Sequence, residues 1–203
     1  IEMISGIPRG GEKGFRTSYS DDCGKTWSEF KHYFPTGKYG GIVAHASLTR
    51  IKKKKGDMDN KWLGIFHDLN YNNWKTYLSF DENGEEVWTE PVRLLEEHNL
   101  IEKTAQLCEI EVLRSPDGNQ LALIARSQGK KNNSMIAFSN DEGETWTEPL
   151  ELQGALMGER HKATYDPISG RLLITFREII RDPKKTGDKN DWVAGHWVAW
   201  VGT

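Results

Sequence analysis

The sequence has little that would tie it to a metal, a membrane or a nucleic acid. Only two cysteines occur, Cys23 and Cys108, too few for a disulfide framework and without a metal-binding spacing. No apolar run approaches the roughly 18 residues of a membrane-spanning helix. The net charge is −3 over 203 residues with no pronounced acidic or basic half, so nothing favours nucleic acid as a partner. We therefore expect no metal, no cofactor, no nucleic-acid partner and no membrane span.

The chain also lacks the marks of disorder and of a leader segment. Charged residues make up 28% and aromatic residues 10% of the sequence, values typical of a folded chain. Residues 1–14 have neither the charged start nor the apolar run of a signal peptide. Because the first residue is Ile1 and not methionine, we expect a longer protein that includes this chain, and the compartment stays open.

Three segments share one pattern at a regular spacing. Residues 20–27 and 139–146 both fit S-x-D-x-G-x-T-W, and residues 79–88 keep the order with one extra residue on each side of Gly84. The opening serines are 59 and 60 residues apart, which indicates a repeat architecture. In such a turn the Asp accepts hydrogen bonds from main-chain amides, the Gly supplies a positive φ, and the Trp packs between neighbouring units.

Between these turns, short β-rich runs alternate with turn residues, and no helix of useful length is expected. One repeat divides into four strands, at residues 108–114, 120–126, 134–139 and 145–152. Four antiparallel strands repeated about every 60 residues predict the blades of a β-propeller, an all-β fold. We place the blades at residues 1–34 (the end of one blade), 35–95, 105–153 and 154–203 (incomplete).

Blade topology gathers certain residues at one rim. Strand one begins where strand two ends, and the S-x-D-x-G-x-T-W turn lies at the opposite rim. The polar residues predicted to reach the first rim are Glu109, Arg126, Arg160, His161, Arg177, His67 and Asp68. Because arginine binds carboxylates through a bidentate fork, this set predicts a site for a carboxylate-bearing ligand. For any single residue, an ordinary ion pair at the rim is an equal alternative.

With these residues the chain resembles the sialidase (neuraminidase) superfamily and its BNR or Asp-box repeats. The resemblance rests on the three turns and on Glu109 opening one strand while Arg126 closes the next. Residues 158–161, 176–177 and 191–202 are similar to a bacterial branch of sialidase-like proteins. The resemblance implies a six-bladed propeller, of which this chain supplies about half, and a secreted or periplasmic location.

The resemblance further implies an exo-sialidase-type glycoside hydrolase. Such an enzyme releases a terminal sialic or related acidic sugar from a glycan with retention, and it uses a Tyr nucleophile instead of a second carboxylate. Glu109 would be the base that activates the Tyr, with Glu111 as a second candidate, and Arg126 would bind the substrate carboxylate. The remaining substrate-binding residues would be Arg160, His161, Arg177, His67 and Asp68.

The chain also departs from the family pattern. The Tyr, the acid/base Asp and the first clamp arginine would lie in blades outside residues 1–203, and no Arg stands at residues 190–193, where a third is expected. Arg160 or Arg177 would take its place. The chain alone is therefore expected to be inactive, with the remaining blades as its partners. Two alternatives stay open: a non-catalytic propeller that binds a glycan or a protein, and an arabinanase-like hydrolase without a carboxylate clamp.

Overall fold

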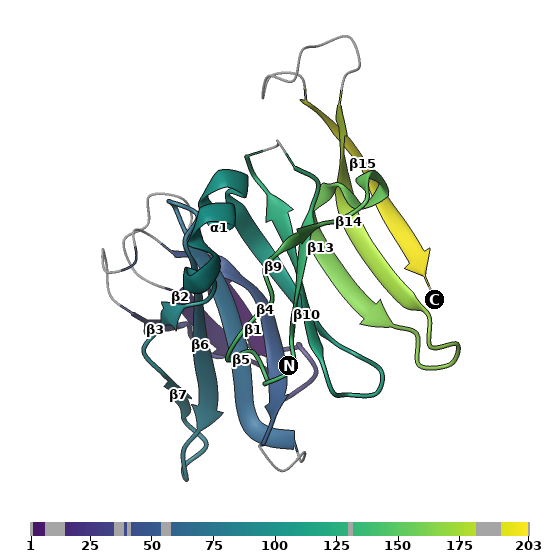
Figure 1. Ribbon diagram of the computed structural model, residues 1–203. Helices are drawn as coiled ribbons and strands as arrows, with labels where there is room; N and C mark the ends of the chain where they lie inside the picture. The colour runs from purple at the N-terminus through teal and green to yellow at the C-terminus, as the bar shows by residue number, and fades with distance from the viewer. Residues whose placement is uncertain are drawn as a thin grey trace.

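The computed structural model describes residues 2–6, 15–34, 39, 42–53, 58–129, 132–181 and 192–202. These residues form an all-β fold of antiparallel sheets, as the alternating pattern predicts, and the sheets lie side by side (Figure 1). The first sheet contains β1 (Glu2–Gly6), β2 (Phe15–Tyr19) and β3 (Lys31–Tyr33). The second contains β4 (Ile42–Lys52), β5 (Met58–Asp68), β6 (Asn73–Phe80), β7 (Glu86–Trp88) and β8 (Val92–Arg93), which pairs with β6.

The third sheet follows the predicted four-strand pattern most closely. It contains β9 (Leu107–Arg114), β10 (Leu121–Ser127), β11 (Met135–Ser139) and β12 (Leu150–Glu151), in the order β12-β11-β10-β9. The last strand is much shorter than the predicted residues 145–152. The turn extends through Thr145, and Thr147 donates a single main-chain hydrogen bond to Phe138 at 2.8 Å. Pro149 has no N–H to donate to a strand neighbour, so the regular ladder begins at Leu150.

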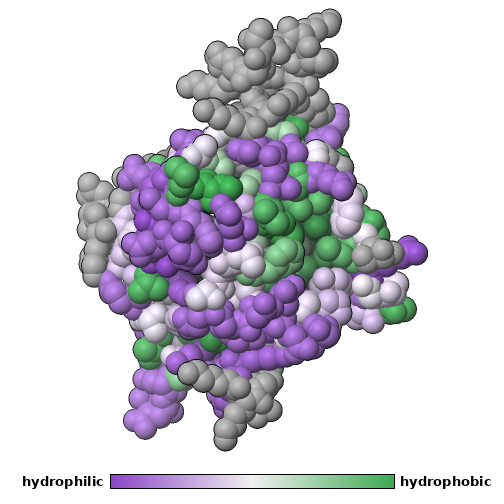
Figure 2. Space-filling view, viewed as in Figure 1, coloured by the Kyte–Doolittle hydropathy of each residue, from purple (hydrophilic) through white to green (hydrophobic). Residues whose placement is uncertain are grey.

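The fourth sheet contains β13 (Gly158–Tyr165), β14 (Leu172–Arg181) and β15 (Trp192–Gly202). Here β14 continues past Arg177 and Glu178, where the sequence predicted a strand end. The side chains of Trp197 and Val201 on β15 are exposed. In Figure 2, a hydrophobic area lies over the third and fourth sheets within a largely hydrophilic surface.

Short helical segments connect the sheets, and one of them corrects the expectation of an essentially helix-free chain. They are η1 (Glu96–His98), α1 (Asn99–Ala105) and η2 (Gly154–Leu156). Helix α1 is too short to show a helical period in the sequence, and a single buried carboxylate anchors it. Glu102 accepts hydrogen bonds from the main-chain N–H and the side-chain amide of Asn73, at 2.8 and 3.0 Å, and it also pairs with Arg93.

The S-x-D-x-G-x-T-W turns have the predicted hydrogen bonds. In the third sheet, the Asp141 carboxylate accepts from the main-chain N–H of Thr145 at 2.9 Å and from its hydroxyl at 2.5 Å, and Gly143 has a φ of +86°. Asp22 accepts the same two hydrogen bonds from Thr26, at 2.9 and 2.7 Å. The two tryptophans differ, because Trp146 is buried in the core whereas Trp27 is 41% exposed.

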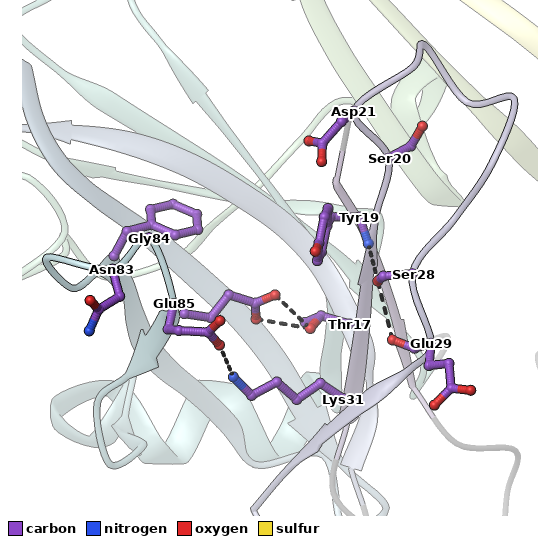
Figure 3. A pocket seen from close by; sticks show the side chains of 12 residues that line it. Thr17, Tyr19, Ser20, Asp21, Ser28, Glu29, Lys31, Asn83, Gly84 and Glu85 are labelled. Carbon is purple, nitrogen blue, oxygen red and sulfur yellow. Dashed lines mark hydrogen bonds and ion pairs between the residues drawn. The ribbon is translucent and has the colours of Figure 1, made fainter.

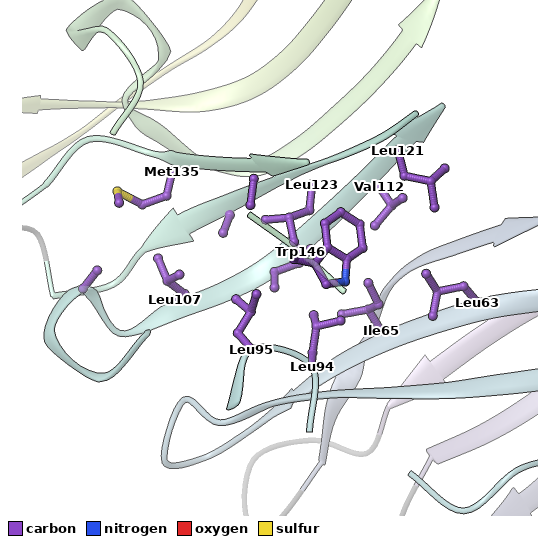
Figure 4. Close-up of a cluster of buried hydrophobic side chains, with 14 of the residues drawn as sticks. Leu63, Ile65, Leu94, Leu95, Leu107, Val112, Leu121, Leu123, Met135 and Trp146 are labelled. Atoms are coloured by element: carbon purple, nitrogen blue, oxygen red, sulfur yellow. The ribbon is translucent and has the colours of Figure 1, made fainter. Parts of the chain in front are cut away.

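The main core lies between the second and third sheets (Figure 4). Its buried side chains include Leu63, Ile65, Leu94, Leu95, Leu107, Val112, Leu121, Leu123, Met135 and Trp146. The turn after β11 also locks onto the second sheet. The buried Lys75 ammonium donates to the carbonyl oxygens of Gly143 and Glu144 at 2.8 and 3.0 Å, and the main-chain N–H of Lys52 on β4 donates to the Glu142 carboxylate at 2.8 Å. Neighbouring sheets are therefore joined both by apolar packing and by this turn.

The first strands of successive sheets pack against one another, with β9 between β4 and β13. Their pairing places the beginning of each of these strands beside the end of the next strand. Cys108 on β9 pairs with Arg126 on β10, Glu159 on β13 pairs with Arg177 on β14, and Val43 on β4 pairs with His67 on β5. The turn after β11 lies at the opposite end of the sheet, where Ser139 pairs with Leu121.

Candidate functional site

The rim of β9 and β13 carries two bulges at equivalent positions. The register shifts between the pairs Arg126↔Cys108 and Ile124↔Glu111, and again between Arg177↔Glu159 and Thr175↔Lys162. Glu109 and Arg160 are the residues that follow the paired position in each strand, and both have a left-handed backbone, with φ of +48° and +58°. Non-glycine residues rarely adopt this conformation, and such strain is concentrated at functional sites.

An ion-pair network connects these bulges to the neighbouring strands. Arg126 donates a hydrogen bond from one terminal nitrogen to Glu109 at 3.0 Å, and its other terminal nitrogen forms an ion pair with Glu159 at 2.7 Å. Glu159 also pairs with Arg177. The main-chain N–H of Arg160 donates to the second oxygen of Glu109 at 3.1 Å. We call Glu109, Arg126, Glu159, Arg160 and Arg177 the rim network.

A cavity of about 190 Å³, the rim cavity, opens beside this network. Its lining residues are His67, Leu69, Tyr71, Cys108, Glu109, Arg126 and Gln128. The His67 and Tyr71 rings are stacked, with centroids 6.0 Å apart. Burial lowers the pKa of His67, so its imidazole is neutral near pH 7. Burial raises the pKa of the Cys108 thiol to about 12, which makes it a poor nucleophile. Among the described lining residues, Glu109 carries the carboxylate.

Asp68 is the last residue of β5 and does not line the rim cavity. Its carboxylate accepts hydrogen bonds from the main-chain N–H groups of Asn70 and Asn72, at 2.8 and 3.0 Å, from the Asn72 amide at 2.6 Å and from the Trp74 indole at 3.3 Å. These donors lie in the turn after β5 and at the start of β6. Asp68 therefore acts on the rim cavity indirectly, by fixing the turn that carries Tyr71.

His161 is buried behind the network. Its Nε2 lies 3.0 Å from the Ser134 hydroxyl, and its ring is stacked on Phe176 with centroids 5.4 Å apart. Burial lowers the pKa of His161 to about 4, so the ring is neutral at physiological pH. In this arrangement His161 supports β13 and does not reach the rim cavity.

The two remaining arginines are placed differently. Arg160 is exposed, and its guanidinium has no partner within the described residues. Arg177 is held by the buried Glu159 and lies outside the lining of the rim cavity. Arg160 is therefore the arginine of the network with its donors free for an incoming anion.

Glu111 lies two residues after Glu109 on β9 and also contacts β13. Its carboxylate binds the Lys162 ammonium at 2.6 Å. Burial raises the pKa of Glu111, and the Lys162 contact opposes that rise. Unlike Glu109, Glu111 does not line the rim cavity.

Sequence reasoning missed the central position of Glu159, which is 3% exposed and holds two arginines. It also missed Tyr71 and Gln128 in the cavity lining. A signal for Glu159 was present, because it stands at the start of its strand opposite Arg177, the same position that Cys108 holds opposite Arg126. Residues 182–191, which hold part of the segment expected to carry a third clamp arginine, lie outside the described residues.

Within the described residues, no group of three or more His, Cys, Asp or Glu side chains is arranged to hold a metal ion. None of the described helices has the length and apolarity needed to cross a membrane.

Comparison with known proteins identifies the fold and not the family. No protein-family model matches the chain, and no curated protein matches it. The α-L-arabinofuranosidase PaAbf62A from Podospora anserina, solved with cellotriose, is similar in structure at a TM-score of 0.62 and 14% identity, over 98% of this chain and 59% of that one. A Dyadobacter fermentans protein of unknown function is similar at a TM-score of 0.53 and 19% identity, over 83% of this chain and 46% of that one.

The chain thus spans about half the length of these two structures. The likeness to the arabinofuranosidase fits a β-propeller, and it shows that a glycoside hydrolase uses an all-β fold of this kind. At these identities the comparison carries no information on substrate or on the residues that act.

Proposed function

We propose that the rim network is part of the substrate site of a glycoside hydrolase that releases a terminal acidic sugar, of the exo-sialidase type. One observation carries this proposal: Glu109 lies at the rim cavity on a strained bulge, between the Arg126 guanidinium and the main-chain N–H of Arg160. A cavity of about 190 Å³ suits one terminal sugar better than a long glycan segment.

The proposed roles are those that the resemblance to sialidases implies, and the contacts support them. Glu109 would act as the base toward a Tyr nucleophile carried by a blade outside this chain, in a six-bladed ring of which this chain forms about half. Arg126 and Arg160 would bind the sugar carboxylate, Arg160 with free donors and Arg126 by exchanging its bond to Glu109. The His67 and Tyr71 rings would form a wall for the apolar face of the sugar.

A neutral terminal sugar is the second candidate, and the saturation of Arg126 favours it. Both terminal nitrogens of Arg126 are already bound to carboxylates, so the guanidinium is less available to a substrate anion than an unpaired arginine would be. In this case Arg126 would serve to hold Glu109 in place, and the substrate would carry no carboxylate.

The test uses the full-length protein and two fluorogenic substrates, an α-sialoside and an α-L-arabinofuranoside. We expect cleavage of the sialoside and a fall in kcat/KM of about 10²-fold or more for Glu109→Gln, because a general base typically contributes that much. Glu82→Gln, an exposed change in the turn after β6, is the matched control and should leave kcat/KM unchanged.

The possible results separate the candidates. Cleavage of the arabinofuranoside alone would reject the acidic-sugar proposal in favour of the neutral one. Cleavage of neither substrate, by a folded protein, would reject both and leave a non-catalytic binding propeller. Activity in residues 1–203 alone would contradict the assignment of the Tyr to another blade.

A further inference from the structure

A second cavity, of about 500 Å³, lies on the opposite rim, between the first and second sheets. Thr17 and Tyr19 on β2 form one side, and Gly84 and Glu85 in the turn after β6 form the other. Figure 3 shows open space between Tyr19 and the turn that carries Asn83, Gly84 and Glu85. We call this cavity the turn-side groove. Its size is typical of ligand pockets.

The same junction occurs once more in the chain, between the second and third sheets. Tyr19 and Tyr77 are equivalent, because the main-chain N–H of each donates to a hydroxyl of the following strand, Ser28 at 3.0 Å and Thr89 at 2.9 Å. Thr17 and Lys75, two residues earlier on the same face of their strands, are therefore equivalent as well. In the facing turns, Gly84 takes the motif position of Gly143, and the two residues Glu85 and Glu86 follow it where Glu144 alone follows Gly143 before the Thr position.

At the second of these junctions, an ammonium group fills the space. Lys75 is 6% exposed, and its ammonium donates to the carbonyls of Gly143 and Glu144 and approaches the Glu144 carboxylate at 3.5 Å. The Tyr77 hydroxyl donates to the same carboxylate at 3.1 Å. The fold thus contains one complete ammonium site at this kind of junction.

At the first junction the corresponding residue is Thr17, which carries no charge and cannot supply a cation. Thr17 bonds through its hydroxyl to the Glu86 carboxylate at 2.9 Å, and Tyr19 is 53% exposed beside the open space. Lys31 reaches Glu85 from β3 at 2.8 Å with half of its side chain exposed, so its charge lies at the edge of the groove. Within the described residues, no ammonium donates to Gly84 as Lys75 does to Gly143.

The lining of the groove is rich in acceptors and poor in donors. Four carboxylates line it, those of Asp21, Glu29, Glu85 and Glu86, against the single ammonium of Lys31. The aromatic rings of Tyr19 and Phe80 are both about half exposed there. Carboxylates and aromatic faces attract a cation, and an ammonium has only donors to offer. An anionic glycan would be repelled by the same charges.

We propose that the turn-side groove binds an alkylammonium group, which takes the position that Lys75 holds at the next junction. This site is separate from the rim network and does not depend on the proposed hydrolase activity. The ammonium belongs either to a small amine or to a lysine side chain of a peptide, since the recognised group is the same.

The first test compares two probes of equal shape on the full-length protein, n-butylammonium and n-butanol, by NMR titration. We expect saturable shifts for β2 and the turn after β6 with n-butylammonium only, weakening as salt is added. Equal binding of n-butanol, or no binding of n-butylammonium at millimolar concentration, would overturn the proposal.

Nα-acetyl-lysine amide is a third probe, which distinguishes a peptide lysine from a small amine. Tighter binding than n-butylammonium assigns the group to a peptide, and weaker binding assigns it to a small amine.

Substitutions at Thr17 provide the second test. Thr17→Lys should abolish binding of n-butylammonium and raise the Tm by about 2–4 °C, because the chain then supplies its own ammonium. Thr17→Met, of similar length without charge, should give no such rise, and Thr17→Ser should bind like the wild type. Tyr19→Ala should weaken binding about threefold through loss of the cation–π contact. Unchanged binding in a folded Thr17→Lys protein would contradict the proposed position.

Discussion

The main-chain N–H of Arg160 donates to the Glu109 carboxylate over 3.1 Å, and both residues hold a left-handed backbone at the same place in neighbouring strands. Each bulge turns its residue out of the regular alternation of the strand. As a result, the main-chain N–H of Arg160 meets the carboxylate that lines the rim cavity. Two strained residues in equivalent positions indicate that the strain belongs to the repeat.

The strain at Arg160 can be measured without loss of a contact. Because its guanidinium has no partner within the described residues, Arg160→Ala should leave the stability nearly unchanged, whereas Arg160→Gly should stabilise the protein by about 1 kcal/mol relative to Arg160→Ala. Urea unfolding of the full-length protein would measure this difference. Equal stabilities would mean that the backbone at residue 160 relaxes. Both variants should bind an acidic sugar more weakly.

Removal of the Glu159 carboxylate should be costly. Glu159 is buried and holds Arg126 and Arg177, so Glu159→Ala leaves Arg177 without its carboxylate partner and Arg126 with Glu109 alone, and should destabilise the protein by about 3 kcal/mol. Glu159→Gln keeps the shape and one acceptor and should cost less. Chemical denaturation of the two variants side by side would test this order. A Glu159→Ala protein as stable as the wild type would show that the arginines find other partners.

Acid should destabilise the fold through its buried histidines. The ring nitrogens of His45 are inaccessible and have no hydrogen-bond partner in the part of the chain that the structure describes, and burial lowers the pKa of His45 from 6.5 to about 3. Between these values the unfolded chain binds a proton that the folded chain does not, so stability falls as the pH drops below about 6.5. The slope should be about 1.4 kcal/mol per pH unit for each such histidine.

His161, with a pKa lowered to about 4, adds to the same slope. His45→Leu should reduce the slope of stability against pH by the contribution of one proton, because leucine does not titrate. Leucine is a suitable replacement because the His45 ring packs among the apolar side chains Phe15, Phe66 and Trp88. Thermal melts of both proteins between pH 7 and about pH 4.5 would show the difference. Parallel curves for wild type and His45→Leu would mean that His45 becomes protonated without loss of structure.

The two tryptophans of the matching turns should contribute unequally. Trp146→Ala should cost about 3–5 kcal/mol, because the ring is buried in the main core. Trp27→Ala should change stability by less than about 0.5 kcal/mol in the full-length protein if the ring stays exposed there. A large cost at Trp27 would show that another part of the full-length protein covers it. Differential scanning calorimetry would measure both.

Local features were the most predictable from the sequence. Asp141, Gly143 and Thr145 make hydrogen bonds within one turn, so their roles follow from residue types and spacing alone. The placement of Glu109 and Arg126 at one rim followed from the alternation of strands and turns, since antiparallel pairing leaves little choice of which ends meet.

Features that depend on long-range packing were not predictable. Glu159 became central only because a bulge in β13 brings it beside Arg126, a residue of another sheet. The role of Asp68 depends on donors from the residues that follow it, and the role of His161 depends on the Ser134 hydroxyl. No period in the sequence reveals either contact. Helix α1 is fixed by Glu102 through Asn73, a partner 29 residues away.

The bond from Lys75 to the turn after β11 ends on the main-chain oxygens of Gly143 and Glu144. Every amino acid carries such an oxygen, so the side chains of that turn can change through evolution while the joint between the repeats is kept. The joint between these two repeats therefore depends on the lysine of β6 and on the shape of the turn, and not on which side chains the turn carries.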